Sequence, residues 1–322
     1  TDLGFSRYTS SWQDVVNVPE VKLVSVCTPN DTHAEIAIAA LKLGKSVWCE
    51  KPMSSNLPDS KKMLAASKKS KGKTIIGYNY TKNPAVLHAR ELIETGVIGD
   101  VAGFFCRYDV DNEADKKRPW SWRMSRKASG TGANGDILSH VISVAHFLVG
   151  STISKVVGDI NIVHPKRKDP TNRKQTKTVD NDDMISALIH FQNGVHGHIG
   201  ASRVTWGKKC GLTWELHGTE GTIIFDQERL NEIKLFTRQK KKSTDGFRTI
   251  LTGPDHPFYK SFLPNGGHSL GFMDVKMCEL QMLLFAIEHD TETWPNFESG
   301  YEIEKVMDAV DRSALSGKWI KI

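Results

Sequence analysis

Three residues of this chain carry side chains suited to proton transfer: a lysine, an aspartate and a histidine. Lys51 directly follows a β-rich run, residues 46–49, and the next residue, Pro52, stiffens the turn. Asp136 and His140 are four positions apart, so they would share one face of a helix. Such a carboxylate can orient the imidazole and favour its protonated form, as a general base requires. The structural alternative is a surface lysine, a capping aspartate and an unrelated surface histidine.

The elements around Lys51 alternate between strand and helix. Strands are expected at residues 21–27, 46–49 and 74–78, and helices at 32–43 and 57–71. This order indicates a parallel sheet with right-handed crossovers. Ligands bind beyond the carboxyl ends of such strands. Thr28-Pro29-Asn30 and Glu50-Lys51-Pro52 would therefore share one edge, although the first could equally be a turn that caps a helix.

The pattern changes near residue 82. Helices are expected at residues 84–94, 136–148, 270–289 and 302–316, and strands at 101–110, 184–191, 195–201, 212–217 and 221–225. Residues 120–135 and 164–178 are expected to form loops, the second exposed. The predicted fold is α/β: a partial Rossmann dinucleotide-binding domain over residues 1–81, then an α+β domain over 82–322 with a large, mostly antiparallel open sheet.

Composition limits the classes of function. The net charge of +6 comes largely from short lysine-rich runs without interleaved aromatic residues, which is typical of solvated surfaces and argues against nucleic-acid binding. No apolar run is long enough to span a membrane. The five cysteines are scattered without a CxxC pair, which favours a reducing, cytoplasmic setting and argues against a metal site.

Two motif matches lack the context that their functions need. Residues 130–135 spell GxGxxG, but a polar segment precedes them where the dinucleotide fingerprint requires a strand. Residues 267–271 spell GxSxG around Ser269, again without a preceding strand. His289 is the only later histidine, at the far end of the following predicted helix, so a serine hydrolase triad is not expected.

The chain resembles the glucose–fructose oxidoreductase and inositol dehydrogenase superfamily, often called Gfo/Idh/MocA. The matching segments extend over nearly the whole chain. They are residues 28–33, 44–52 with the Glu-Lys-Pro motif, 96–99, 119–123, 135–140 with the Asp-x-x-x-His motif, 191–194, 295–300 and 313–317.

The resemblance implies NAD(P)-dependent transfer of a hydride between the cofactor and a hydroxyl or keto carbon of a sugar, anhydrosugar or cyclitol. It implies a catalytic set of Lys51, Asp136 and His140, with His140 as the base. It also implies a homodimer or homotetramer formed through the open sheet. The implied cofactor contacts are Thr28, Pro29, Asn30, His33, Glu50, Lys51, Asn79, Trp122 and Arg123, and the implied substrate contacts are Tyr80, Tyr259 and His268.

The chain departs from the family pattern in three places. The family opens with a strand, GxGxxG and a helix, whereas this sequence starts after that point, so we expect that an N-terminal segment of the natural protein is missing. Ser143 stands where relatives often carry an acidic residue, and Phe272 where an aromatic hydroxyl is common. The absent phosphate loop supports an alternative function, a non-catalytic binding or regulatory protein on the same fold.

Overall fold

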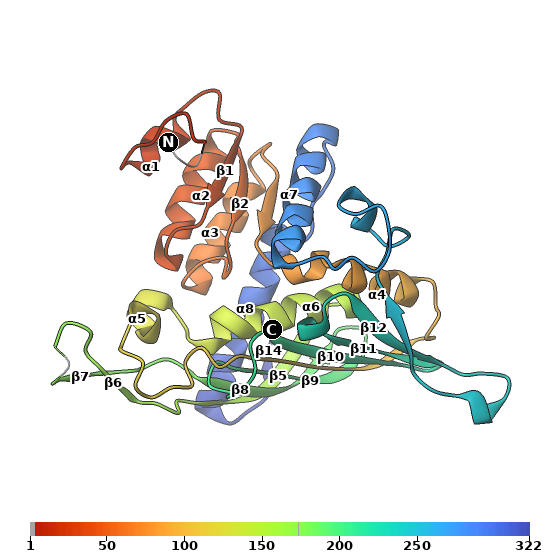
Figure 1. The fold of residues 1–322 in the computed structure, drawn as a ribbon. Coiled ribbons are helices and arrows are strands. Elements are labelled where there is room, and N and C mark those ends of the chain that lie inside the picture. Colours follow the sequence, from red (N-terminus) through yellow and green to blue (C-terminus); the bar gives the residue numbers. More distant parts are fainter. Residues whose placement is uncertain (1–3, 173) are drawn as a thin grey trace.

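The computed structural model describes residues 4–172 and 174–322. In this part of the chain a small parallel sheet contains β1 (Leu23–Val26), β2 (Ser46–Cys49) and β3 (Thr74–Ile76), in that order. The helices that accompany it are α1 (Trp12–Val16), α2 (His33–Lys42) and α3 (Leu57–Ser67). The sheet and its parallel pairing agree with the Rossmann-type arrangement predicted from the sequence (Figure 1).

Local sequence explains where these helices begin and end. Helix α2 buries Ile36, Ala37, Ala40 and Leu41 against the sheet, which is the stripe expected of a helical period. Asn56 caps α3 by accepting the Asp59 N–H at 3.0 Å. The predicted end of α3 at residue 71 was wrong. The chain must turn back there to reach β3, and a Cβ on Gly72 would lie 2.1 Å from the Lys45 carbonyl oxygen.

In the described residues, nine strands form a second, larger sheet (Figure 1). Only β4 and β9 pair in parallel within it, and all other neighbours are antiparallel, which confirms the predicted mostly antiparallel sheet. The strand order is β13 (Arg248–Leu251), β12 (Glu232–Thr237), β11 (Gly221–Asp226), β10 (Gly211–Gly218), β4 (Val101–Asp109), β9 (His196–Ser202), β8 (Met184–Phe191), β5 (Ile153–Asn161), β14 (Ile320–Lys321).

Helices cover one face of the large sheet and connect it to the small one (Figure 1). Almost every residue of α6 (Ser139–Val149) is buried there. Helix α8 (Phe297–Ser316) packs against β5 and also contacts β3 of the small sheet. Just before this helix, the Pro295 carbonyl accepts the Ile76 N–H at 2.9 Å. The remaining α-helices are α4 (Pro84–Glu94), α5 (Arg126–Ser129) and α7 (Phe272–His289).

Short tight helices lie in several connections. The 3₁₀ turns are Asn30–Thr32, Asn79–Lys82, Trp122–Met124, Gln227–Arg229, Lys242–Thr244 and Tyr259–Ser261. A π-helical turn, Asn134–Leu138, precedes α6, so the helix predicted to start at residue 136 instead begins as a wider turn that carries Asp136. Because a π turn adds a residue to the helical repeat, it redirects the side chain at this point.

The prediction that residues 164–178 form an exposed loop was wrong in part. Strands β6 (Lys166–Lys168) and β7 (Thr176–Thr178) pair there as a hairpin. Arg167 is buried, and its guanidinium donates to the backbone carbonyls of Glu113 and Asp115. The sequence could not reveal that Arg167 binds these carbonyls, because composition does not distinguish a buried arginine of this kind from a solvated one. Across the described residues, no helix is long and apolar enough to cross a membrane.

Candidate active site

Lys51 and Asp136 meet in a close ion pair. Lys51 follows β2, and its Nζ lies 2.6 Å from Asp136 Oδ1 and 2.8 Å from the Asp136 carbonyl oxygen. The Lys51 side chain is 19% exposed and that of Asp136 is 41% exposed. The ammonium of Lys51 lowers the pKa of Asp136 to about 2, so this carboxylate is ionised at neutral pH. Two acceptors from one turn thus fix the position of a single ammonium group.

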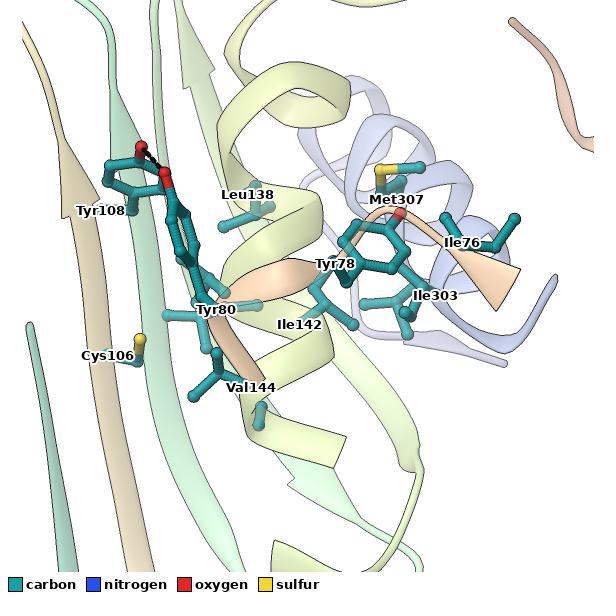
Figure 2. Close-up of a cluster of buried hydrophobic side chains, with 14 of the residues drawn as sticks. Ile76, Tyr78, Tyr80, Cys106, Tyr108, Leu138, Ile142, Val144, Ile303 and Met307 are labelled. Atoms are coloured by element: carbon teal, nitrogen blue, oxygen red, sulfur yellow. Dashed lines mark hydrogen bonds between the residues drawn. The ribbon is translucent and has the colours of Figure 1, made fainter. Parts of the chain in front are cut away.

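His140 lies one helical turn beyond Asp136 and is 5% exposed. The rings of Tyr80, Tyr78 and Tyr108 surround it, with centroids at 4.5, 5.6 and 5.9 Å. Its Nδ1 has no hydrogen-bond partner among the described residues. Figure 2 shows how Tyr80 and Tyr108 pack beside α6, which carries His140.

The imidazole of His140 is neutral. Burial lowers its pKa well below the usual value, the Lys51 ammonium lowers it further, and Asp136 opposes both effects. Asp136 favours the protonated form, as expected, but its effect is smaller than that of burial. Burial between tyrosine rings from distant segments outweighs the carboxylate, and sequence spacing alone could not reveal it. A neutral imidazole with a free ring nitrogen can accept a proton.

A cavity of about 540 Å³ opens beyond the carboxyl ends of β1 and β2. Most of the residues predicted for the cofactor line this cavity, and so does Asp136. These residues are Thr28, Pro29, Asn30, His33, Glu50, Lys51, Trp122 and Arg123. Asn79, Tyr80 and His140 are not part of its lining. The volume falls in the range of small-molecule sites, and the mixed charged and aromatic lining suits a polar ligand with a planar ring.

Hydrogen bonds fix the wall of the cavity formed by the small sheet. The His33 ring nitrogens lie 2.9 Å from the Thr28 carbonyl oxygen and 3.1 Å from the Pro52 carbonyl oxygen. His33 is buried, so it connects two loops that face the cavity. Asn30 Nδ2 donates to the Ser129 carbonyl at 3.2 Å and joins this wall to the opposite one.

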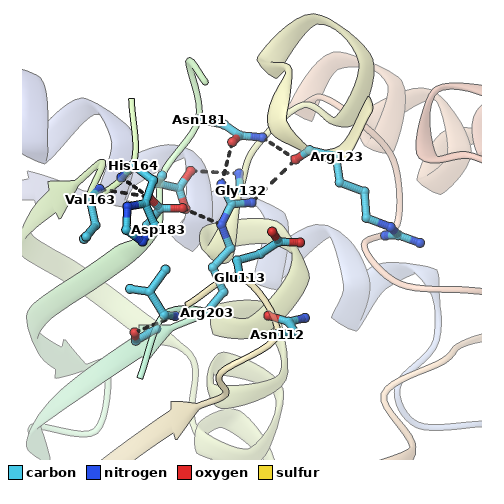
Figure 3. A network of polar contacts seen from close by, with 12 residues as sticks. Asn112, Glu113, Arg123, Gly132, Val163, His164, Asn181, Asp183 and Arg203 are labelled. Carbon is cyan, nitrogen blue, oxygen red and sulfur yellow. Dashed lines mark hydrogen bonds and ion pairs between the residues drawn. The ribbon is translucent and has the colours of Figure 1, made fainter. Parts of the chain in front are cut away.

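The opposite wall carries residues that sequence reasoning missed: Asn112, Glu113, Arg118 and Arg203. Arg203 Nε donates to Asp183 at 2.7 Å, and Arg203 Nη2 to Asn181 Oδ1 at 2.8 Å (Figure 3). Asn181 in turn donates to the Arg123 carbonyl at 2.7 Å. These residues follow different strands, and no motif or periodicity marks them.

Comparison with known proteins agrees with this geometry. Residues 2–78 match the oxidoreductase family with an NAD-binding Rossmann fold, and residues 86–224 match the Gfo/Idh/MocA C-terminal domain. The chain belongs to the Gfo/Idh/MocA family of oxidoreductases. The resemblance stated from the sequence is thereby confirmed.

Relatives within the family include sugar and cyclitol dehydrogenases. The chain is 35% identical to levoglucosan dehydrogenase of Pseudarthrobacter phenanthrenivorans over 99% of its own length and 84% of the relative's. It is 24% identical to inositol 2-dehydrogenase of Rhizobium meliloti over 94% and 81% of the two chains. A solved complex of levoglucosan dehydrogenase with NADH and levoglucosan superposes with a TM-score of 0.96 at 36% identity, covering 100% of this chain and 85% of that one.

Other residues suggested by the family pattern lie outside the cavity. The Tyr80 hydroxyl hydrogen-bonds that of Tyr108 at 2.8 Å beside His140. Asn79 is buried, and its Nδ2 has no partner among the described residues. Tyr259 is fully buried and donates to the His268 carbonyl, which argues against a substrate contact. The His268 side chain is exposed and does not line the cavity.

Neither of the two isolated motif matches forms the site that its pattern would suggest. In the Gly-rich segment 130–135, the N–H groups of Gly132 and Asn134 donate to the Asp182 carboxylate at 2.8 and 2.5 Å. A Cβ on Gly132 would lie 2.0 Å from the Asp182 carbonyl oxygen, so this loop encloses an internal carboxylate. Ser269 is exposed ahead of α7, whereas His289 ends that helix and contacts the Phe285 carbonyl at 3.0 Å. The distance along the helix separates the serine from this imidazole.

Proposed function

We propose that this chain is a dehydrogenase that interconverts a hydroxyl and a keto group on a sugar, anhydrosugar or cyclitol, with Lys51, Asp136 and His140 as the catalytic set. One observation carries the proposal. An ionised carboxylate, Asp136, holds an ammonium group at 2.6 Å, and this carboxylate lies one helical turn before a neutral, buried imidazole. A cation and a proton acceptor in one site are the groups that alcohol oxidation requires.

Each member of the set has a separate task. His140 takes the hydroxyl proton, because a neutral imidazole carries one unprotonated ring nitrogen. Lys51 stabilises the negative charge that develops on the substrate oxygen. Asp136 and its own carbonyl hold the Lys51 ammonium in place. When bound beside this set, a nicotinamide cofactor would supply the redox chemistry as the acceptor of the hydride from carbon.

The cavity beyond β1 and β2 fits the nicotinamide end of the cofactor. We assign Thr28, Asn30 and Glu50 to one wall of that site and Trp122 and Arg123 to the other. The Arg123 guanidinium stacks over the Trp122 ring at 4.6 Å, so this wall offers a cation beside an aromatic face. His33 keeps the Thr28 and Pro52 loops in register.

Similarity supports a carbohydrate or cyclitol as the substrate. Levoglucosan dehydrogenase matches this chain over most of its length, and the inositol dehydrogenase also aligns over most of it. Near His140, Ser143 is buried, and Phe272 lies with its ring centroid 6.2 Å from that of Tyr80. We therefore expect this part of the site to differ from relatives that have an acid and a hydroxyl at these two positions.

The uncovered face of the large sheet supports a proposed homo-oligomer. Phe105 and Leu188 flank His198 in register across β4, β9 and β8, and they are 44% and 53% exposed. An apolar row on the face opposite the helices is a surface that a second copy of the chain would cover.

The proposal is tested by a screen of cyclitols, aldoses and anhydrosugars with NAD and NADP, followed by absorbance of the reduced nicotinamide. Lys51→Met and His140→Asn should each lower kcat by about 10²- to 10⁴-fold with the fold intact. His289→Asn, a change at an exposed histidine, serves as the matched control. Near-normal turnover in both site variants would exclude this mechanism. Absence of turnover together with absence of cofactor affinity would favour the non-catalytic alternative.

A further inference from the structure

Helix α7 places a cation against the loop that carries Lys51. Lys276 Nζ lies 2.7 Å from Glu50 Oε1, although the two residues are 226 positions apart. Glu50 Oε2 accepts the Lys51 backbone N–H at 3.3 Å. The carboxylate of Glu50 therefore joins the ammonium of Lys276 to the backbone of Lys51.

A second carboxylate anchors Lys276. Glu279, one turn further along α7, is fully buried, and its Oε2 accepts from Lys276 Nζ at 3.1 Å and from Trp48 Nε1 at 3.1 Å. Trp48 belongs to β2, the strand that leads into the loop. Glu279 Oε1 has no hydrogen-bond partner among the described residues, so both hydrogen bonds to this carboxylate are accepted by Oε2.

The backbone immediately after β3 leaves room for this arrangement. A Cβ on Gly77 would lie 2.8 Å from Glu50 Oε2 and 3.1 Å from Lys276 Nζ. Because Gly77 has no side chain, the Glu50 carboxylate and the Lys276 ammonium can approach each other beside the end of β3.

We propose that Lys276 is a positioning residue: with Glu279 and Trp48 it holds Glu50, and thereby the backbone of Lys51, in the geometry that catalysis needs. The inference rests on the proposed function for its catalytic meaning. The contacts that carry it are separate from the Lys51–Asp136 pair.

Stability alone is a weak explanation for this cluster. Burial raises the pKa of Glu279 despite the opposing cation of Lys276, which shows that the surroundings disfavour its charge. Burial also opposes the charge of Lys276, but Glu279 and Glu50 together raise its pKa. Desolvating such groups offsets much of their attraction, and apolar replacements of buried ion pairs are often as stable. The positioning of Glu50 and the Lys51 backbone explains the presence of these charges better than stability does.

Lys276 also contributes to the electrostatics of His140. The charged groups near the imidazole are Lys51, Asp136 and Lys276, and the ring is otherwise enclosed by tyrosines. The groups facing Lys276 are Glu50 and the Trp48 ring from the small sheet and Glu279 from its own helix. Removing the Lys276 cation should therefore raise the pKa of His140.

The test compares Lys276→Gln with Lys276→Arg, which retains the cation, and with Lys305→Gln. Lys305 is a partly exposed lysine on α8 that pairs with Glu302 at 2.9 Å, so its loss is a matched change of charge. We expect K276Q to lower kcat by roughly 10- to 100-fold and to move the acidic limb of the kcat/KM profile to higher pH. K276R should recover most of kcat, and K305Q should behave as the unmodified chain.

Amide hydrogen exchange provides a readout that is independent of turnover. In K276Q, residues 49–56 should exchange roughly tenfold faster, whereas β8 and β9 should be unchanged. Unchanged exchange in this segment, or kcat within twofold of the unmodified chain, would overturn the inference. If the unmodified chain turned over no sugar or cyclitol, the proposed function would fail, and exchange would still decide the positioning role.

Trp48→Phe is a milder variant that removes the indole N–H from Glu279 and retains an aromatic ring, and it is used if K276Q does not fold. Faster exchange of residues 49–56 in W48F would support the inference. Exchange identical to that of the unmodified chain would refute it.

Discussion

Glu304 of α8 should make the stability of this protein depend on pH. It is 5% exposed, and its Oε1 accepts the Met53 N–H at 2.9 Å, directly after the Lys51–Pro52 turn. Burial raises the pKa of Glu304 from 4.5 to about 8, although the backbone N–H groups of Ser54 and Met53 oppose this. The folded protein therefore keeps a proton on Glu304 at pH values where the unfolded chain has lost it.

The magnitude follows from the two pKa values. The interval from 4.5 to about 8, at about 1.4 kcal/mol per pKa unit, corresponds to about 5 kcal/mol. Because the folded state binds the extra proton, this contribution is complete below about pH 4.5 and is lost as pH rises towards 8. Local relaxation and water entry reduce the cost of the buried charge, so we expect about 2 to 5 kcal/mol.

Glu304→Gln isolates this contribution, because glutamine has the shape of the protonated acid and still accepts the Met53 N–H. Urea unfolding followed by circular dichroism from about pH 5 to about pH 9 should show the unmodified chain losing stability relative to E304Q. Glu302→Gln, at a residue whose side chain is 28% exposed on the same helix, is the matched control for the loss of one carboxylate. Parallel curves for E304Q and the unmodified chain would show that Glu304 is already ionised when folded.

Two further predictions concern other parts of the molecule. Asp182→Asn should lower the free energy of unfolding by about 2 kcal/mol and reduce kcat, because the charged acceptor for the Gly132 and Asn134 N–H groups is lost. Thermal unfolding measures the change in stability and a turnover assay measures the change in kcat. An unchanged melting temperature would contradict this prediction. Leu188→Glu should reduce the mass of the oligomer in multi-angle light scattering, because it places a charge among the exposed side chains of Phe105 and Leu188 on the large sheet. An unchanged mass would exclude this interface, and so would an unmodified chain that is already monomeric.

The sequence was sufficient where local rules decide the structure. Thr28 and Lys51 were expected at one edge because parallel strands must align their carboxyl ends, and both line the same cavity. The strands expected at residues 184–191 and 195–201 likewise formed, and they pair in antiparallel register on either side of Asn193-Gly194, a dipeptide that favours hairpin turns. In each case the relevant interactions lie within one or two neighbouring elements.

Sequence reasoning failed where residues far apart in the chain determine the environment. The proton state of His140 depends on Tyr78, Tyr80 and Tyr108, and two of these tyrosines lie on a segment some sixty residues earlier. The burial of Arg167 depends on backbone carbonyls more than fifty positions away. Periodicity and motifs report on neighbours along a helix or strand, so they carry no information about such contacts.

The supports of the Lys51 loop come late in the chain, and this has a consequence for biosynthesis. Glu50 leaves the ribosome long before its partner Lys276, which lies 226 residues later. At a translation rate of about 5–20 residues per second, the interval is roughly 10 to 45 seconds. During that time the nascent polypeptide contains Lys51, but it does not yet contain α7 and α8, the two helices whose side chains contact the Lys51 loop. A ribosome that stalls before α7 would therefore release a product whose Lys51 loop lacks the contacts with both of those helices.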